Sequence, residues 1–179
     1  MRIEEIFNNC EFIGSLVGTE TVSIKLPINV AGFDKSTLLY IREIPSQKMN
    51  TEIYLRIESS ANNIINLSTE MQTKIWEELW NKYIWTCEET EPFDILDSED
   101  VKSANIRYYG IEDLNTLKKL TIISNVDIEV ISNLDDEYEE ELPNEELIWN
   151  LNFGADWIGD GYFQITINYD NILNSVLYQ

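Results

Sequence analysis

Regular alternation of apolar and polar residues predicts strands in the first 60 residues of this chain. The segment 21–26 alternates strictly, as a strand with one buried face requires. Segment 51–58 alternates in the same way, so Ile53, Leu55 and Ile57 would share one face of a second strand. These patterns predict a half-buried sheet near the N-terminus.

A further strand is predicted over residues 36–44, between Gly32 and Pro45. Pro27 lies at the end of the strand predicted over 21–26. Proline has no N–H to donate to a neighbouring strand, so its position favours an edge strand or a strand terminus.

Residues 68–86 have the pattern of a long amphipathic helix. Thr69 and Gln72 have the spacing of a capping box, in which each side chain satisfies a free backbone donor of the first turn. Apolar residues then recur at spacings of three, four and one, and form one broad stripe: Met71, Ile75, Trp76, Leu79, Trp80, Tyr83 and Ile84. We interpret this stripe as packing against the sheet rather than as a cofactor groove.

The second half of the chain is predicted to be rich in strands. An acidic connector over 88–100 precedes them, and 111–117 is predicted to be a short helix or turn. The predicted strands are 104–109, 121–131, 147–153, 162–169 and 172–178. Strands outnumber helices and the one long helix falls in mid-chain, which favours a single α+β domain over βαβ winding. We therefore expect one domain over residues 1–179, with N-terminal strands within 12–58, a mixed or antiparallel sheet packed on helix 68–86, and a strand-rich acidic third over 120–179.

Charge is distributed unevenly along the chain. The 179 residues include 12 Lys and Arg, 33 Asp and Glu and no His, for a formal net charge of −21. No basic residue follows Lys119, whereas 13 acidic residues do. Many apolar residues are interspersed there, so we expect a folded region with an acidic exterior. Direct binding to nucleic acid is disfavoured, because such binding depends on cationic side chains.

The residue types present exclude several kinds of chemistry. Without histidine, the chain has no Ser-His-Asp or Cys-His catalytic arrangement. Cys10 and Cys87 cannot build a four-ligand zinc site alone, and we expect both to be reduced and packed. The acidic turn 156–161 lacks two ligands of a calcium loop, at Ile158 and Ile167. We expect no cofactor, no metal and no catalytic residue.

Acidic residues are densest in segment 135–146, where eight of them surround Pro143. Such a loop can steer and orient a basic protein partner, although a solvated loop that maintains solubility is the simpler interpretation. Tyr138 and Trp157 fall in predicted loops, where exposed aromatic side chains can anchor an interface, and burial of Trp157 in the core is the alternative. The predicted partner-binding residues are Asp135, Asp136, Glu137, Tyr138, Glu139, Glu140, Glu141 and Trp157. Trp149 is expected in the core.

The sequence contains no targeting signal that we recognise. No run approaches the roughly 20 apolar residues of a membrane-spanning helix. Acidic residues at positions 4 and 5 stand where a secretory signal would carry basic ones. We therefore expect a cytoplasmic protein that does not contact a membrane.

The tail of the chain resembles the end of uncharacterised bacterial domains that are encoded beside toxin genes. The resemblance rests on the strand 147–153, the turn Asp156-Trp157-Ile158-Gly159-Asp160-Gly161 and the strand 162–169. The turn of that family usually has a histidine before its glycine, where this chain has Asp160. The resemblance implies an immunity-type protein that neutralises a partner toxin, or a neighbour of unknown role.

These observations favour a non-catalytic module that binds and occludes a basic partner, such as a nuclease toxin. Two alternatives remain open. Paired carboxylates could serve a hydrolase or a divalent-metal enzyme, which would show converging acids in a pocket. A regulatory or structural module without a toxin partner would use its acidity for solubility alone.

Overall fold

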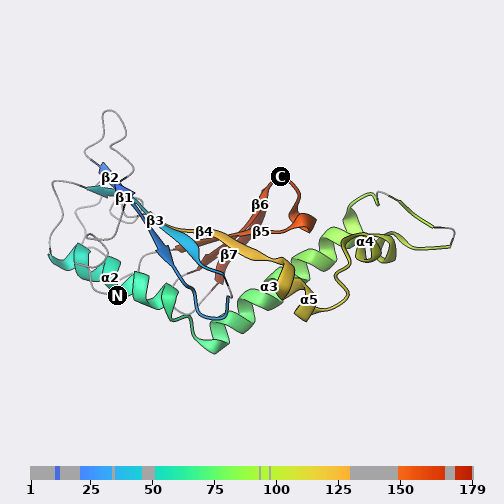
Figure 1. The fold of residues 1–179 in the computed structure, drawn as a ribbon, viewed down its shortest axis with the longest axis horizontal. Coiled ribbons are helices and arrows are strands. Elements are labelled where there is room, and N and C mark those ends of the chain that lie inside the picture. The colour runs from blue at the N-terminus through green and yellow to red at the C-terminus, as the bar shows by residue number, and fades with distance from the viewer. Residues whose placement is uncertain are drawn as a thin grey trace.

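One mixed sheet organises the chain (Figure 1). The structure, a computed structural model, describes residues 11–12, 21–33, 35–45, 51–92, 94–96, 98–129, 149–167 and 172–178. Within these ranges the sheet has seven strands, which lie side by side in sequence order. They are β1 (Glu11–Phe12), β2 (Thr21–Ile28), β3 (Thr37–Pro45), β4 (Ile122–Glu129), β5 (Trp149–Gly154), β6 (Tyr162–Ile167) and β7 (Ile172–Tyr178).

The chain crosses from β3 to β4 through helices. They are α2 (Thr51–Ile65), α3 (Thr69–Glu89), α4 (Val101–Tyr109) and α5 (Leu114–Leu120). This long crossover makes β3 and β4 parallel, whereas all other neighbouring strands are antiparallel. Figure 1 shows α2 and α3 along one side of the sheet, with α4 near the far end of α3 and α5 beside the middle of α3. The predicted α+β fold is confirmed, with one crossover of the βαβ kind that the sequence pattern did not favour.

The core lies between the sheet and α3. Leu39, Val126, Leu151 and Ile165 are register partners across β3 to β6, and all four side chains are buried. Burying each such aliphatic side chain contributes about 1.5–3 kcal/mol, before the entropy of ordering the chain is counted. This apolar face of the sheet faces the helices, so the opposite face of the same strands is left for polar residues.

Helix α3 confirms the predicted helix and most of its apolar stripe, but its cap differs. Ser68 is the N-cap residue, and its hydroxyl accepts a hydrogen bond from the Met71 backbone N–H at 3.1 Å. The Gln72 side chain donates instead to the Leu67 carbonyl, at 2.8 Å. The capping box predicted at Thr69 is therefore wrong by one residue. Trp76 is buried in the core, as interpreted from the stripe.

The strand predicted over 51–58 is wrong, because these residues begin helix α2. Ile57, Ala61 and Ile64 are fully buried at spacings of four and three, which is the periodicity of a helix. Leu55, which the alternation placed with Ile57 on a buried face, is 60% exposed. The helical pattern over 15 residues overrides alternation over eight.

The strand predicted over 104–109 is also wrong, because these residues belong to α4. The Asp100 side chain caps this helix by accepting the Ser103 backbone N–H at 2.9 Å. Gly110 ends it in the left-handed conformation, with φ of 66°, which glycine adopts without a Cβ clash. Both boundaries are local signals that outweigh the strand propensity of the residues between them.

The remaining strand predictions over described residues are confirmed. Segments 21–26 and 36–44 lie in β2 and β3, and 121–131 spans β4. The three C-terminal strands also form, as β5, β6 and β7. Pro27 is the last residue but one of β2 and pairs with Leu38 of β3, so it lies at a strand terminus, as its lack of an N–H favours. The helix or turn predicted over 111–117 is α5, shifted three residues toward the C-terminus.

Candidate functional site

Trp157 is a core residue, so its predicted role as an exposed anchor is wrong. It lies in a short 3-10 helix, η2 (Asp156–Ile158), and is 2% exposed. Its ring meets Tyr83 of α3 edge-on, with centroids 5.6 Å apart, and lies 6.4 Å from Phe163 of β6. The turn between β5 and β6 folds inward onto α3. Its glycines had indicated an exposed loop. Trp149 is buried, as expected.

The acidic segment 135–141, with Tyr138, lies outside the described residues. The structure does define where the chain leaves and re-enters the sheet on either side of it. Strands β4 and β5 are direct neighbours, and Ile128 pairs with Trp149. The connection 130–148 therefore starts and finishes at one end of the sheet, between two central strands.

The face of the sheet opposite the core presents polar and tyrosine side chains. Strand residues alternate between the two faces, and the core takes Val126, Leu151, Phe153, Phe163 and Ile165. The residues between them on β4 to β7 define what we call the outer sheet face: Asn125, Asp127, Asn150, Asn152, Tyr162, Gln164, Thr166, Asn174, Val176 and Tyr178. The same side of the sheet continues over β3 and β2, where Tyr40 pairs with Asp127 and Lys25 pairs with Tyr40, so the base-free strands β4 to β7 form one part of it.

Hydrogen bonds hold the centre of the outer sheet face in place. The Asp127 carboxylate accepts from the side-chain amides of Asn125 and Asn152, at 2.5 and 2.8 Å. On the neighbouring row, the Thr166 hydroxyl donates to the Asn150 side chain at 2.8 Å. Such cross-strand pairs fix the side-chain rotamers, so a partner would meet a pre-organised polar surface.

Two tyrosines extend the outer sheet face at the end away from the acidic segment. Tyr162 and Tyr178 pair across β6 and β7, and their rings stack with centroids 4.7 Å apart. Their side chains are 40% and 43% exposed. Exposed, partly ordered tyrosines are typical interface anchors. The two tyrosines were not among the predicted partner-binding residues, although alternation over 162–167 places Tyr162 on the polar face with Gln164 and Thr166.

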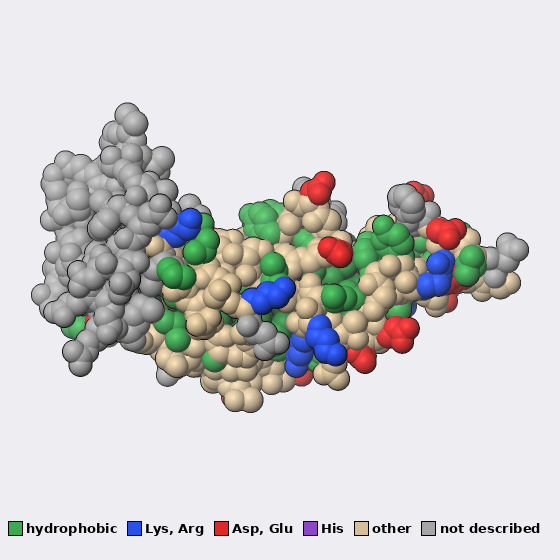
Figure 2. Space-filling model, viewed as in Figure 1, with side chains coloured by type: hydrophobic (Ala, Val, Ile, Leu, Met, Phe, Trp, Pro, Cys, Tyr) green, Lys and Arg blue, Asp and Glu red, His purple; other side chains and the backbone are tan. Residues whose placement is uncertain are grey.

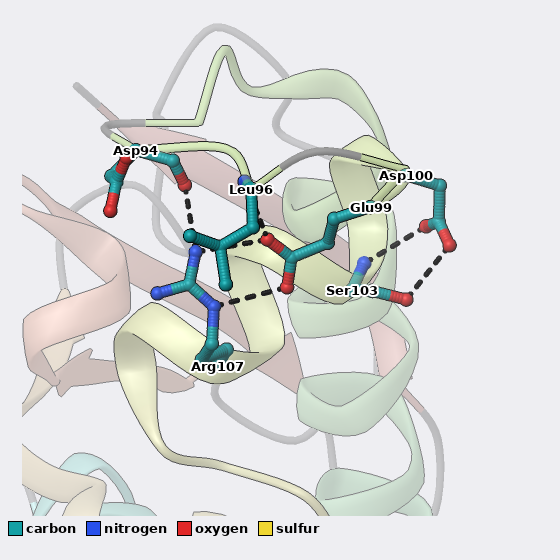
Figure 3. A network of polar contacts seen from close by, with 6 residues as sticks. All are labelled: Asp94, Leu96, Glu99, Asp100, Ser103 and Arg107. Atoms are coloured by element: carbon teal, nitrogen blue, oxygen red, sulfur yellow. Dashed lines mark hydrogen bonds and ion pairs between the residues drawn. The ribbon is translucent and has the colours of Figure 1, made fainter.

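A polar network orders the connector before α4 (Figure 3). Arg107 donates to both carboxylate oxygens of Glu99, at 3.0 and 2.9 Å, and to the Asp94 carbonyl at 3.1 Å. Glu99 also accepts the Leu96 backbone N–H at 3.0 Å. The hydrogen bond from Arg107, with that from Leu96, lowers the pKa of Glu99 from its ordinary 4.5. The network is structural, since it ties the connector to α4.

This network predicts an acid-dependent loss of stability. A carboxyl whose pKa is lowered by folding stabilises the folded state above its unfolded pKa and loses that effect as the pH falls. We expect Glu99→Gln to lower the urea midpoint slightly at pH 7, and the midpoints of the two proteins to converge below about pH 4. Urea titrations at several pH values measure this.

Glu89→Gln is the matched control, because Glu89 is exposed and makes no ion pair or hydrogen bond with another described residue. A pH dependence of Glu99→Gln that equals that of Glu89→Gln would show that the network contributes nothing through ionisation.

Three further features concern metal binding, membrane-spanning helices and the cysteines. Among the described residues, no three Cys, Asp or Glu side chains converge as a metal site would require. None of the described helices is both long and apolar enough to cross a bilayer. Cys87 is a free, buried cysteine, as predicted, and burial raises the pKa of its thiol. Cys10 lies outside the described residues.

Comparisons of the chain with protein-family models, with curated proteins and with solved structures found no match. The resemblance of its tail to immunity-type domains therefore stays a prediction from the sequence.

Proposed function

We propose that this chain is a non-catalytic protein-binding module of the immunity type, which binds and occludes a basic toxin or another basic protein. The observation that carries the proposal is the outer sheet face, which combines ordered amides and hydroxyls with the exposed Tyr162–Tyr178 pair. The strands that build this face from β4 onward contain no Lys or Arg. The eight acids of segment 135–146, which joins β4 to β5, favour a cationic partner by charge complementarity and disfavour nucleic acid.

The acidic segment 135–146 is the second element of the proposed surface. Its eight acids are attached at the Ile128–Trp149 end of the sheet, and the tyrosine pair lies toward the opposite end of the same strands. Strands of six residues span about 20 Å, which suits a standard interface of about 800 Å² on each partner. In this arrangement the acids steer the approach and the tyrosines anchor the complex. The cytoplasm is the proposed location, since an immunity-type protein protects the cell that makes it.

The steering role predicts a kinetic effect. A partner recovered by co-purification from the native cell is mixed with a variant in which Asp136, Glu139 and Glu140 are replaced by lysine. We expect association to slow by about tenfold or more at low salt and its salt dependence to flatten, because steered association accelerates encounter by 10–10³. Stopped-flow association rates at several salt concentrations measure the effect.

A variant with Glu77, Glu89 and Glu112 replaced by lysine is the matched control. Glu77 and Glu89 are exposed on α3 and Glu112 is exposed between α4 and α5, and their replacement changes the net charge by the same amount. Equal slowing in the two variants would show a general charge effect and remove the acidic segment from the contact. Tyr162→Ala tests the anchor separately, since it should raise the dissociation rate while leaving association nearly unchanged.

A further inference from the structure

A cavity of about 210 Å³ lies where the turn after β2 meets the end of α5 and the start of β4. Lys35, Lys118 and Lys119 line it, and all three are exposed. None of the three forms an ion pair or hydrogen bond with another described residue. Figure 2 shows Lys and Arg side chains gathered near the middle of this face of the molecule. In a chain of net charge −21, three converging bases create a local positive site.

The floor of this lysine pocket is apolar and aromatic. Trp76 and Ile123 line it and are each 5% exposed, so they lie beneath the lysines. The Phe33 ring, which is half-buried, packs beside the Trp76 ring with centroids 4.8 Å apart. The Lys118 ammonium lies 5.6 Å from the centre of the Trp76 ring. A positive rim above two aromatic rings suits a ligand that has both an anionic group and a flat ring.

Thr121 supplies an independent observation. It lines the same pocket and is 5% exposed, yet its hydroxyl has no hydrogen-bond partner among the described residues. A buried hydroxyl without a partner is costly, so native proteins rarely keep one. A ligand oxygen bound in the pocket would supply the partner, since a hydroxyl both donates and accepts.

We propose that the lysine pocket binds a small aromatic phosphate monoester of the nucleoside monophosphate type. A phosphate monoester carries about two negative charges near neutral pH, which three ammonium groups can match as point-charge donors. Its ring would lie against Phe33 and Trp76. Lysines in the last turn of a helix also offset the helix dipole, which accounts for Lys118 and Lys119 but not for Lys35 on a separate segment.

This site is separate from the proposed partner-binding surface. The pocket lies at the same end of the sheet as Tyr162 and Tyr178, but on the helix side, where Trp76 of α3 and Lys118 of α5 line it. The two tyrosines and the rest of the outer sheet face lie on the opposite side of the strands. Loss of one activity should therefore leave the other intact. Screening over about 8 Å at physiological ionic strength also limits the repulsion of an anion by distant acids.

The test is isothermal titration calorimetry of the full chain with adenosine monophosphate at low ionic strength, with inorganic phosphate and adenosine as separate probes. We expect saturable binding of the nucleotide, and binding of each fragment weaker by at least about tenfold. Lys35→Gln and Lys118→Gln should each weaken nucleotide binding about tenfold. Lys102→Gln is the matched control, because Lys102 is paired with Glu88 at 2.8 Å, outside the pocket.

Thr121→Val separates binding from folding. It removes a hydroxyl that has no partner in the free protein, so the urea midpoint should stay unchanged or rise while nucleotide affinity falls. The absence of saturable binding at millimolar nucleotide would overturn the proposal. So would equal losses in Lys118→Gln and Lys102→Gln, or equal affinity for inorganic phosphate or adenosine and for the nucleotide.

Discussion

Replacing Trp157 by alanine is expected to lower the free energy of unfolding by about 3–5 kcal/mol. The side chain is 2% exposed and packs between Tyr83 of α3 and Phe163 of β6, so its removal leaves a cavity where helix, turn and sheet meet. Tyr83 cannot move easily into this space, because its hydroxyl donates a hydrogen bond to the Ile111 carbonyl, at 2.9 Å. Urea or guanidinium unfolding followed by circular dichroism measures the loss.

Two further variants make this prediction specific. Trp85 is 49% exposed, with the Lys82 ammonium 3.5 Å from its ring centre, so Trp85→Ala should cost no more than about 1 kcal/mol. Trp157→Phe should cost about 1–2 kcal/mol, because an aromatic ring is retained and the lost indole N–H has no partner among the described residues. If Trp157→Ala were as mild as Trp85→Ala, the side chain would not be part of the core.

The parts of the fold that the sequence predicted well have a long or strict period. The buried stripe of α3 runs from Met71 to Cys87 within a helix of 21 residues, and the alternation in β6 continues without a break through six. Such patterns can be recognised in the sequence because one face of each element is buried and the other is not. The parallel pairing of β3 with β4 was not accessible in this way, because it follows from the path of the helices between them.

The two wrong strand predictions have a common physical cause. Short runs of β-branched and aromatic residues favour strands, but in both cases helical signals outside the run decided the structure. For α2 the deciding signal is the continuation of buried positions to Ala61 and Ile64. For α4 it is the pair of boundaries at Asp100 and Gly110. Propensity within six or eight residues is weaker than capping and packing over the whole element.

The candidate sites were predicted less well than the fold. Charge counting located the base-free third, but it could not distinguish the inward turn at Trp157 from an exposed loop. The stacked pair Tyr162 and Tyr178 requires knowledge of strand register, which sequence alone does not supply. Lys35 and Lys118 are far apart in sequence and meet through the turn after β2, so no local motif indicates their pocket.

Asn105 carries the second large prediction. It lies in α4 with 2% exposure, and its side-chain amide donates to the carbonyls of Cys87 and Thr90, at 3.0 and 2.8 Å. These carbonyls stand at the end of α3, where the last turn of a helix lacks partners of its own. One amide therefore closes the C-terminus of α3 and fixes α4 beside it.

Asn105→Asp should destabilise the protein by about 3–5 kcal/mol at pH 7, since it buries a carboxylate against two carbonyl oxygens and removes both hydrogen bonds. The shape of the side chain is unchanged, so packing does not account for the loss. Burial favours the protonated carboxyl, which can donate one hydrogen bond. The folded variant therefore binds a proton more tightly than the unfolded chain, and the loss relative to wild type should shrink as the pH falls toward about 4.

Asn81→Asp provides the matched control, because Asn81 is exposed on the neighbouring α3 and undergoes the same chemical change. Its effect on the unfolding free energy should stay within about 0.5 kcal/mol at every pH. Urea unfolding of both variants and wild type, compared at each pH, isolates the buried carboxyl from the titration of the other acids. A loss in Asn105→Asp that did not diminish on acidification would mean that the buried charge is not its cause, and a loss no larger than that of Asn81→Asp would mean that Asn105 does not bridge α4 to the end of α3 as described.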